Sequence, residues 1–251
     1  MADSAAYKQS GELGVPSLVW RAGQDRRFQM ILAAAEDRLD DGKVIDVGCG
    51  VGLYLKAFRQ FTSHVYGIEI EEDRAVQAAA FGHIAQSLGE QLACASQVFD
   101  LILSHEVIEH VTYDRACVAE MVRALKVGGR LIVFCPNRLY PFETHGHYWR
   151  GRYHFGNTPL INYRPNGLRN RLAPHVRTYT ARDVRRLFRG QPVRIVQHTR
   201  IFPGYDNVVY SRPRLGLLLR GVTYALERTP LRAFGISHLI VVERLRSNED
   251  S

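Results

Sequence analysis

The stretch Val44-Ile-Asp-Val-Gly-Cys-Gly-Val-Gly52 decides the fold of this chain. A short apolar run that ends in closely spaced glycines predicts a buried strand followed by a tight turn. Glycine has no Cβ and tolerates positive φ, so the backbone of such a turn can approach a ligand closely. The spacing Gly48-x-Gly50-x-Gly52 differs from the G-x-G-x-x-G of dinucleotide sites, and no Lys-Ser or Lys-Thr pair follows it, which disfavours a pyrophosphate ligand.

A second apolar run, His64 to Ile70, carries the acid Glu69, 19 residues after Gly50. An acid at the tip of the next parallel strand is placed to accept hydrogen bonds from both hydroxyls of a ribose. The glycine turn and this acid together predict a nucleotide-like cofactor at the switch point of an α/β sheet.

At these residues the chain resembles the class I S-adenosylmethionine (SAM)-dependent methyltransferases, whose first motif has the form (D/E)-x-G-x-G-x-G, here Asp46 to Gly52. Phe99 to Val111 resembles the fourth strand and following turn of that family, and Leu125 to Asn137 resembles its next turn and fifth strand. The three matches occur in order and at family-like spacing. The resemblance implies a Rossmann-like, doubly wound α/β sheet of seven strands, mostly parallel with an antiparallel last strand and with helices on both faces.

The periodicity of the chain places the elements of this sheet. Strands are expected near 43–47, 64–69, 83–86, 99–104, 130–135, 193–198 and 238–245, and helices over 21–39 and 181–188. Length and a hydrophobic content of 46% favour one domain over residues 1–251. Two segments without sheet periodicity, about 138–174 and 202–237, are expected to be cap-like insertions that select the acceptor.

Charge is divided unevenly along the chain. Residues up to Asn137 hold 13 Lys and Arg against 18 Asp and Glu, a balance of −5, whereas the rest hold 20 Arg against 7 acids, a balance of +13. Such asymmetry indicates an anionic partner or a membrane surface for the second half, or an Arg-rich solvated surface with no partner. Leu215 to Leu226 fits a basic amphipathic helix that lies on a bilayer or on a partner, and equally a helix whose leucines face the core.

No membrane span is expected, because the most apolar stretch is broken by Arg220, and the amino terminus lacks a signal-peptide pattern. The four cysteines form no C-x-x-C pair, which is typical of reduced packing residues in a cytoplasmic protein.

The resemblance carries the cofactor contacts over residue by residue. It implies that the glycine turn faces the methionine moiety, that Glu69 holds the ribose, and that Ser104 or His105 lies beside the sulfonium. The candidate cofactor residues are Arg26, Asp46, Gly48, Cys49, Gly50, Glu69, Ile70, Glu90, Ser104 and His105.

Two of these assignments go with open alternatives. Arg26 and Arg27 are both candidates for the cofactor's carboxylate, because a helix at this place in the family often lends a basic group; two solvated arginines are the alternative. Glu90 is the candidate for the adenine amine, at a place where the sequence departs from the family's usual Asp.

Glu106-Val-Ile-Glu109-His110 predicts a divalent-metal site. On a helix, positions i, i+3 and i+4 share one face, so both carboxylates and the imidazole would point at one ion such as Mg²⁺, Mn²⁺ or Zn²⁺. The E-x-x-E-H pattern resembles ubiquinone-pathway O-methyltransferases and small-RNA 2′-O-methyltransferases, and an ion there would activate an acceptor hydroxyl. Alternatively, His110 packs locally with no metal.

The candidate catalytic bases are His110, His145 and His147, and His175 is a further histidine that could serve the same site. The leading function is SAM-dependent O-methylation of a small hydroxylated or lipid-like acceptor. The alternatives are RNA 2′-O-methylation, favoured by the basic second half, and a non-catalytic SAM-binding scaffold.

Overall fold

The computed structural model describes residues 20–247. The chain divides into two compact units, which are described separately. The accessory unit comprises Met1–Arg26, Pro136–Ala181 and Thr199–His238, and the sheet unit comprises Arg27–Cys135, Arg182–His198 and Leu239–Ser251. Both segments expected as insertions fall within the accessory unit; the organisation as one domain with two caps stays a prediction.

The sheet unit is built on seven strands in the order β10-β11-β5-β4-β1-β2-β3. The strands are β1 (Val44–Val47), β2 (Val65–Glu69), β3 (His83–Gln86), β4 (Phe99–His105), β5 (Leu125–Pro136), β10 (Val193–Ile201) and β11 (Ser237–Arg244). Strands β1 to β5 pair in parallel, and β11 pairs antiparallel with β5. The Rossmann-like fold expected from the sequence is confirmed.

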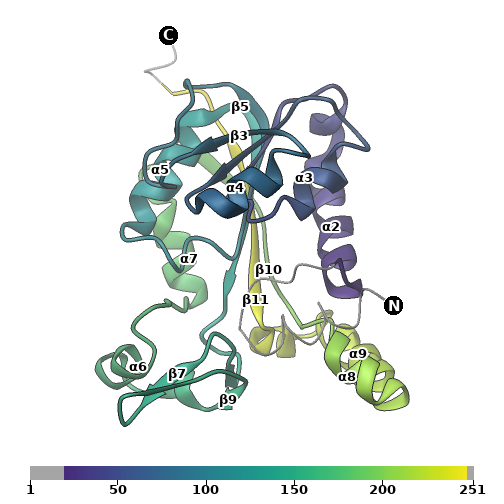
Figure 1. The fold of residues 1–251 in the computed structure, drawn as a ribbon, viewed down its shortest axis with the longest axis vertical. Helices are drawn as coiled ribbons and strands as arrows, with labels where there is room; N and C mark the ends of the chain where they lie inside the picture. Colours follow the sequence, from purple (N-terminus) through teal and green to yellow (C-terminus); the bar gives the residue numbers. More distant parts are fainter. Residues whose placement is uncertain (1–19, 248–251) are drawn as a thin grey trace. The chain divides into compact units, whose positions relative to one another are not determined.

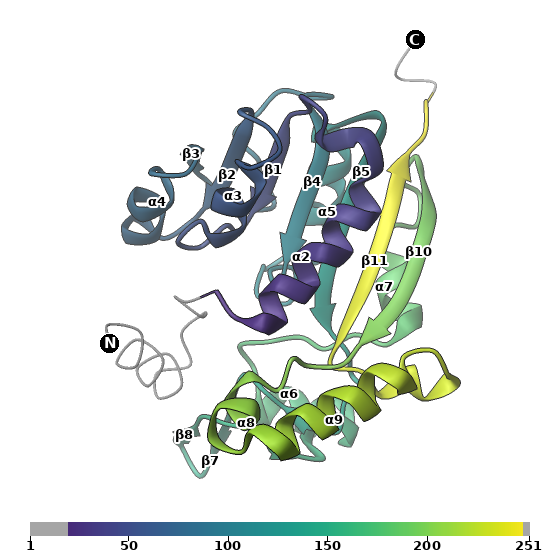
Figure 2. The same ribbon diagram turned by 90° about the vertical axis from the view of Figure 1, so that its right-hand side faces the viewer.

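Helices cover both faces of this sheet. Helices α2 (Ala22–Ala35) and α3 (Leu53–Phe58) lie on one face, and α5 (Asp114–Ala124) and α7 (Ala181–Leu187) lie on the other (Figures 1 and 2). Because both faces are covered, β1 is buried along its whole length, as its continuous apolar sequence requires. On the α2 side, the ring of Phe28 lies 5.4 Å from that of Phe58.

The strand order fixes where a ligand can bind. Strand β1 lies between β2 and β4, so the chain leaves β1 toward one side and returns on the other. Ligands of open α/β sheets bind at such a switch point, beyond the carboxyl ends of the strands. The glycine turn follows β1 directly, and α4 (Glu72–Ala78) and the 3₁₀ helix η1 (Glu36–Leu39) complete the unit.

The accessory unit contains more regular structure than its sequence indicated. Strand β6 pairs with β9 and β7 pairs with β8, both antiparallel. Its elements are β6 (Phe142–Glu143), β7 (His147–Trp149), β8 (Arg152–His154), β9 (Thr158–Pro159), η2 (Ile161–Tyr163), α6 (Asn166–Leu172), α8 (Asp206–Ser211), α9 (Pro213–Leu226) and η3 (Pro230–Phe234). Each of these strands has only two or three residues, too short for an alternating pattern to be recognised in the sequence.

Within the described residues, no helix has both the length and the apolar character that crossing a bilayer requires. All four cysteines are free thiols, and three of them, Cys49, Cys117 and Cys135, are buried.

Candidate cofactor and catalytic site

The glycine turn after β1 is tied to the end of β2. Gly48 and Cys49 donate their backbone N–H groups to the carbonyl oxygen of Ile68 at 2.8 and 2.9 Å. Gly48, Gly50 and Gly52 all have positive φ, the region that favours glycine. A Cβ at Gly48 would come within 2.5 Å of Val107, so packing excludes a larger residue there. A Cβ at Gly50 would meet no protein atom within 4 Å, so the turn presents bare backbone to open space at this position.

Glu69 holds this turn in place from the tip of β2. Its Oε2 accepts the N–H of Gly50 at 2.7 Å, and its Oε1 accepts the N–H groups of Ile70 and Glu71 at 2.9 and 3.0 Å. Glu69 as a whole residue is 5% exposed. A carboxylate has about four lone-pair directions, so three backbone donors leave about one free, on Oε2. The carboxylate can therefore accept one of the two predicted ribose hydrogen bonds without displacing a backbone donor.

Two polar side chains at the carboxyl ends of β1 and β4 are buried without a hydrogen-bond partner in the described part of the chain. They are Oδ1 of Asp46 and Oγ of Ser104. Burial, together with the nearby carboxylate of Glu69, raises the pKa of Asp46 from 3.8 to about 8. Buried polar atoms without partners are costly, and they commonly mark a place where a ligand or water supplies the missing contact.

His105, at the end of β4, is held as a neutral ring. Burial and the guanidinium of Arg27 lower the pKa of His105 from 6.5 to about 3. Arg27 Nη1 lies 2.6 Å from Nε2 of His105, and because arginine only donates, Nε2 is the acceptor and the proton of the ring is on Nδ1. The ring also packs against Tyr54 and Phe134, with centroids at 5.0 and 5.1 Å. His105 therefore orients Arg27 and does not carry a proton at neutral pH.

Of the two arginines proposed for the cofactor's carboxylate, the structure brings Arg27 to the end of β4. Arg27 also donates to Oε1 of Glu106 at 3.1 Å. Arg26 makes its contacts inside the accessory unit: it donates to Glu227 at 2.5 Å and stacks 3.6 Å from the ring centroid of Tyr224. Arg26 stays a prediction for the cofactor's carboxylate, and Arg27 is the one of the two arginines that contacts the end of β4.

Glu90 has a structural task that the sequence did not indicate. Its Oε1 accepts the backbone N–H groups of Thr112 and Tyr113 at 2.8 and 3.1 Å, which fixes the backbone just before α5. This engagement weakens the assignment of Glu90 to adenine.

Two exposed aliphatic side chains follow the paired ends of β2 and β3. Glu69 is in register with Gln86, Ile70 is 56% exposed and Leu88 is 50% exposed. Large apolar side chains exposed at strand ends are suited to contact a flat heterocycle. Ile70 is among the predicted cofactor residues, and Leu88 lies two residues before the adenine candidate Glu90.

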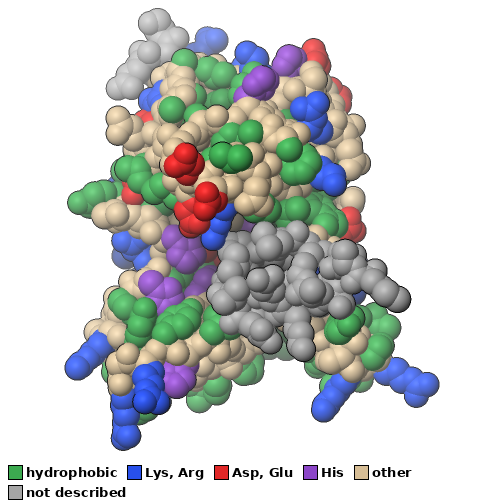
Figure 3. Space-filling model, in the orientation of Figure 1, with side chains coloured by type: hydrophobic (Ala, Val, Ile, Leu, Met, Phe, Trp, Pro, Cys, Tyr) green, Lys and Arg blue, Asp and Glu red, His purple; other side chains and the backbone are tan. Residues whose placement is uncertain are grey.

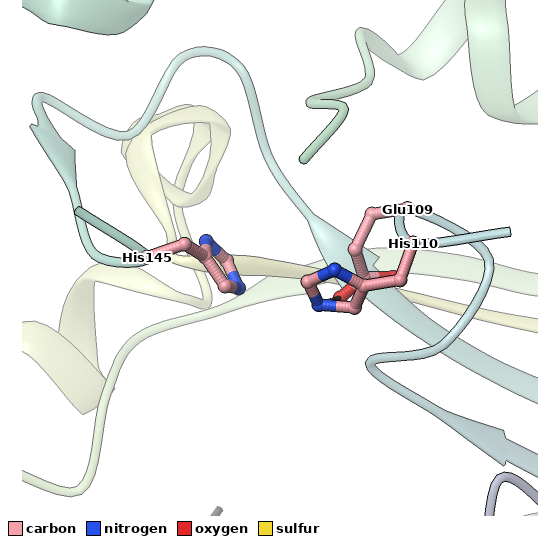
Figure 4. A group of neighbouring side chains, drawn as sticks. All are labelled: Glu109, His110 and His145. Atoms are coloured by element: carbon pink, nitrogen blue, oxygen red, sulfur yellow. Dashed lines mark ion pairs between the residues drawn. The ribbon is translucent and has the colours of Figure 1, made fainter. Parts of the chain in front are cut away.

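The segment that carries Glu106, Glu109 and His110 is a turn, and α5 begins only at Asp114. The expected helical face is wrong, because Glu106 has a φ of 57°, outside the helical region. Glu109 is nonetheless fully buried, and in the described residues neither of its carboxyl oxygens has a hydrogen-bond partner. Burial and the neighbouring carboxylate of Glu106 raise the pKa of Glu109. Nε2 of the half-exposed His110 lies 3.9 Å from Oε1 of Glu109 (Figure 4).

The other predicted histidines belong to the accessory unit. His145, which is also drawn in Figure 4, has its Nδ1 3.2 Å from Oε1 of Glu143. His147 has its Nδ1 3.2 Å from Oγ1 of Thr158, and His175 has its Nε2 3.1 Å from the carbonyl oxygen of His145. Each of the three thus has a local structural contact.

Comparison with known proteins supports the same interpretation of residues 44–137. A protein-family model described as a methyltransferase domain matches residues 45–133. The ubiquinone biosynthesis O-methyltransferase of Xylella fastidiosa (strain 9a5c) is 33% identical over 108 residues, which is 40% of this chain and 44% of that protein. The protein of the same name from Parvibaculum lavamentivorans is 30% identical over 114 residues, 42% of this chain and 45% of that protein. The chain thus matches less than half the length of these curated relatives.

Solved structures share the fold over most of the chain. A SAM-dependent methyltransferase from Mesorhizobium loti superposes with a TM-score of 0.61 at 17% identity, covering 87% of this chain and 97% of that one. A geranyl diphosphate C-methyltransferase from Streptomyces coelicolor A3(2), solved with Mg²⁺, has a TM-score of 0.57 at 15% identity, covering 88% and 78%. At such identities the likeness concerns the fold alone. Residues 45–133 therefore match a methyltransferase domain, and they lie in a seven-stranded sheet that has the Rossmann-like fold of these solved structures.

Proposed function

We propose that the protein binds SAM and transfers its methyl group to a hydroxyl oxygen of a small hydroxylated or lipid-like acceptor. The observation that carries this proposal is the glycine turn: Gly50 presents bare backbone to open space and is hydrogen-bonded to Glu69. A site of this kind suits a nucleoside whose ribose hydroxyl donates one hydrogen bond to the carboxylate.

The residues at the strand ends fit SAM. The backbone from Gly48 to Gly50 would face the methionine moiety, and Glu69 would accept a hydrogen bond from the ribose. The buried carboxyl of Asp46 lacks a partner for Oδ1 among residues 20–247, and a cationic ligand nearby would favour its ionised form. Ile70 and Leu88 offer exposed apolar surface for the adenine.

SAM, when bound, would supply a methyl group that an acceptor oxygen attacks in line while the sulfur leaves as a neutral thioether. The protein's part is then to align the acceptor and to remove its proton. In a mechanism without a metal, His110 is the candidate base in the sheet unit, since its ring is half exposed in the turn after β4. An oxygen acceptor is favoured because the relatives in the comparison carry the name O-methyltransferase.

Glu109 and His110, with Glu106 beside them, are proposed to hold a divalent cation such as Mg²⁺, Mn²⁺ or Zn²⁺. A fully buried carboxyl whose two oxygens lack a hydrogen-bond partner in the described chain is an unusual feature, and a metal ion would supply the missing partner. A cation there would lower the pKa of an acceptor hydroxyl.

The test is a transfer assay with methyl-labelled SAM. The purified protein is incubated with three acceptor pools, namely simple catechols, an organic extract of membrane lipids, and short structured RNA. Label in the catechol or lipid pool is the expected result. Label in RNA alone would establish the RNA 2′-O-methyltransferase alternative and reject the small acceptor.

Calorimetric titration with SAM and with S-adenosylhomocysteine examines the cofactor step separately. If the protein binds neither ligand, the proposal that it uses SAM is refuted. A protein that binds both equally and labels no pool would be the non-catalytic scaffold.

A further inference from the structure

Helix α9 packs Gly216 and Arg220 toward the protein, whereas three of its leucines and Val222 are exposed. Toward the protein, Arg220 donates to the carbonyl oxygen of Gly204 at 2.8 Å and pairs with Asp206 at 3.2 Å. One helical turn after Arg220, the ring of Tyr224 lies under the guanidinium of Arg26. Glu227, just after the helix, pairs with that same Arg26 at 2.5 Å and accepts the backbone N–H of Phe202 at 2.7 Å.

A glycine fixes which side of α9 faces inward. Gly216 is buried, and a Cβ there would come within 2.5 Å of the backbone of Val209 on α8. Gly216, Arg220 and Glu227 recur at helical spacing on one face. The inward side of α9 therefore packs against α8 and makes polar contacts. The helix cannot turn to bury its leucines without losing these contacts.

The outward side of α9 is aliphatic. Its exposed apolar residues, with their exposed fractions, are Leu215 (42%), Leu217 (56%), Leu218 (63%) and Val222 (51%). The next element, η3, adds exposed Leu231 and Phe234. We call these six side chains the α9 apolar face. Contiguous exposed apolar surface of this kind is costly in water and marks a contact surface.

The charges around the α9 apolar face are all positive. Between Thr199 and His238 the only acids are Asp206 and Glu227, and both are paired with arginines. Exposed arginines flank the apolar residues along the chain: Arg212, Arg214, Arg228 and Arg232. On the face drawn in Figure 3, the side chains over α8 and α9 are apolar, basic or uncharged.

We propose that the α9 apolar face docks onto the surface of a bilayer that contains anionic phospholipids. A helix with aliphatic residues on one side and arginines at its margins lies in the membrane interface, with its apolar side among the acyl chains and its cations at the phosphates. Arginine side chains are long enough to reach the headgroups while the leucines insert.

Two other occupants fit this face less well. A second copy in a two-fold contact would bring the same four arginines of both chains together, with no acid to offset them. A nucleic acid would neutralise the arginines and leave the six apolar side chains in water, since its backbone offers no apolar surface to them.

Vesicle co-sedimentation of the full chain tests the proposal. The protein is expected to pellet with vesicles of phosphatidylcholine and phosphatidylglycerol in equal parts, and to pellet weakly with phosphatidylcholine alone. The double variant Leu218→Asp/Val222→Asp should lower the partition coefficient by about tenfold or more, because both side chains would otherwise insert. The variant Arg214→Ser should lower it by a smaller factor and reduce its dependence on salt.

Matched controls separate docking from general surface effects. Val76 on α4 is 70% exposed and Arg59 is an exposed arginine, both in the sheet unit, so Val76→Asp and Arg59→Ser should leave vesicle binding unchanged. Circular dichroism of each variant checks that it is folded. Failure of the parent to bind anionic vesicles, binding that Leu218→Asp/Val222→Asp leaves intact, or equal binding to neutral vesicles would each overturn the proposal. Dimerisation abolished by the same double variant, or RNA binding without vesicle binding, would assign the face to those occupants instead.

Discussion

Gly50 donates its backbone N–H to Oε2 of Glu69 at 2.7 Å, and a Cβ at Gly50 would meet no protein atom within 4 Å. The hydrogen bond joins the turn after β1 to the tip of β2, so one carboxylate both shapes the turn and stands beside the space over it. Mutations can therefore separate the two residues. A change at Gly50 affects access to the space over the turn, and a change at Glu69 affects the shape of the turn and the charge beside that space.

Gly50→Ala should weaken SAM binding strongly while the protein stays folded. The added methyl points into the open space where the cofactor is proposed to lie, and an alanine at positive φ costs only about 1–2 kcal/mol. Gly128 is the matched control, because it also has positive φ and an open Cβ position but lies within β5, near its start. If calorimetry finds the same SAM affinity for Gly50→Ala and Gly128→Ala, the ligand does not lie over this turn.

Glu69→Gln should lower SAM affinity by roughly tenfold to a hundredfold, the loss of one hydrogen bond to a charged acceptor worth about 1.5–3 kcal/mol. An amide cannot replace the carboxylate, since its NH₂ group would oppose a backbone N–H donor whichever way it is turned. Glu71→Gln, an exposed change two residues on, is the control. An unchanged affinity in Glu69→Gln would show that this acid does not contact the ribose.

His105 should make the protein less stable in mild acid. Burial and Arg27 lower the pKa of His105 to about 3, whereas the unfolded chain protonates this ring near 6.5. The stabilisation is therefore complete above about pH 6.5 and is lost as the pH falls below it, by at most about 1.4 kcal/mol per pH unit. His105→Gln cannot take up the proton, so its urea unfolding free energy should fall less steeply between about pH 6.5 and about pH 4.5. Parallel curves for variant and parent would mean that the folded protein protonates His105 readily; His64→Gln, on a half-exposed ring, is the control.

The ionisation of Asp46 should make the protein less stable as the pH rises, the opposite of the effect of His105. Burial and Glu69 raise the pKa of Asp46 to about 8, so the unfolded chain ionises this carboxyl from about pH 4 while the folded protein keeps it protonated. Stability then falls as the pH rises through this window, by up to about 1.4 kcal/mol per unit. Asp46→Asn keeps the shape without the proton, and its free energy of unfolding should change less between about pH 5 and about pH 7.5. Denaturant titrations of the parent, Asp46→Asn and the exposed control Asp73→Asn make the comparison, and identical slopes in all three would contradict the buried, protonated carboxyl.

Glu109→Gln and His110→Ala should each abolish tight Mn²⁺ binding, measured by the loss of the free-ion signal in electron paramagnetic resonance. The amide is neutral and similar in size, so Glu109→Gln should not lower stability, because it no longer places an ionisable group in a fully buried position. Glu72→Gln, exposed at the start of α4, should retain the parent's behaviour. A parent protein that binds no Mn²⁺, or a Glu109→Gln protein that binds it as before, would leave Glu109 as a buried carboxyl without a metal.

The sequence by itself determined the sheet and the turn. Continuous apolar runs specify buried strands such as β1 wherever both faces are covered, and glycines that must take positive φ, as at Gly48 and Gly50, specify the turn. These are local properties of the backbone and of burial, so they can be inferred without knowing the partners. The position of Glu69 follows in the same way, since a residue at a strand tip is placed by the strand.

Only the tertiary structure decided which side chains are free to act. Arg26 and Arg27 are neighbours on one helix, yet they point about 100° apart, so one meets Glu227 and the other meets His105. Glu106 has a positive φ, so the segment expected to be helical is a turn. No residue type in the segment predicts this backbone conformation. Helical spacing likewise showed that α9 is amphipathic, but not which side faces out. That orientation is set by the buried contact of Gly216 with α8 and by two ion pairs, Arg220 with Asp206 and Glu227 with Arg26. These contacts between elements outweigh the preference of leucine for the interior.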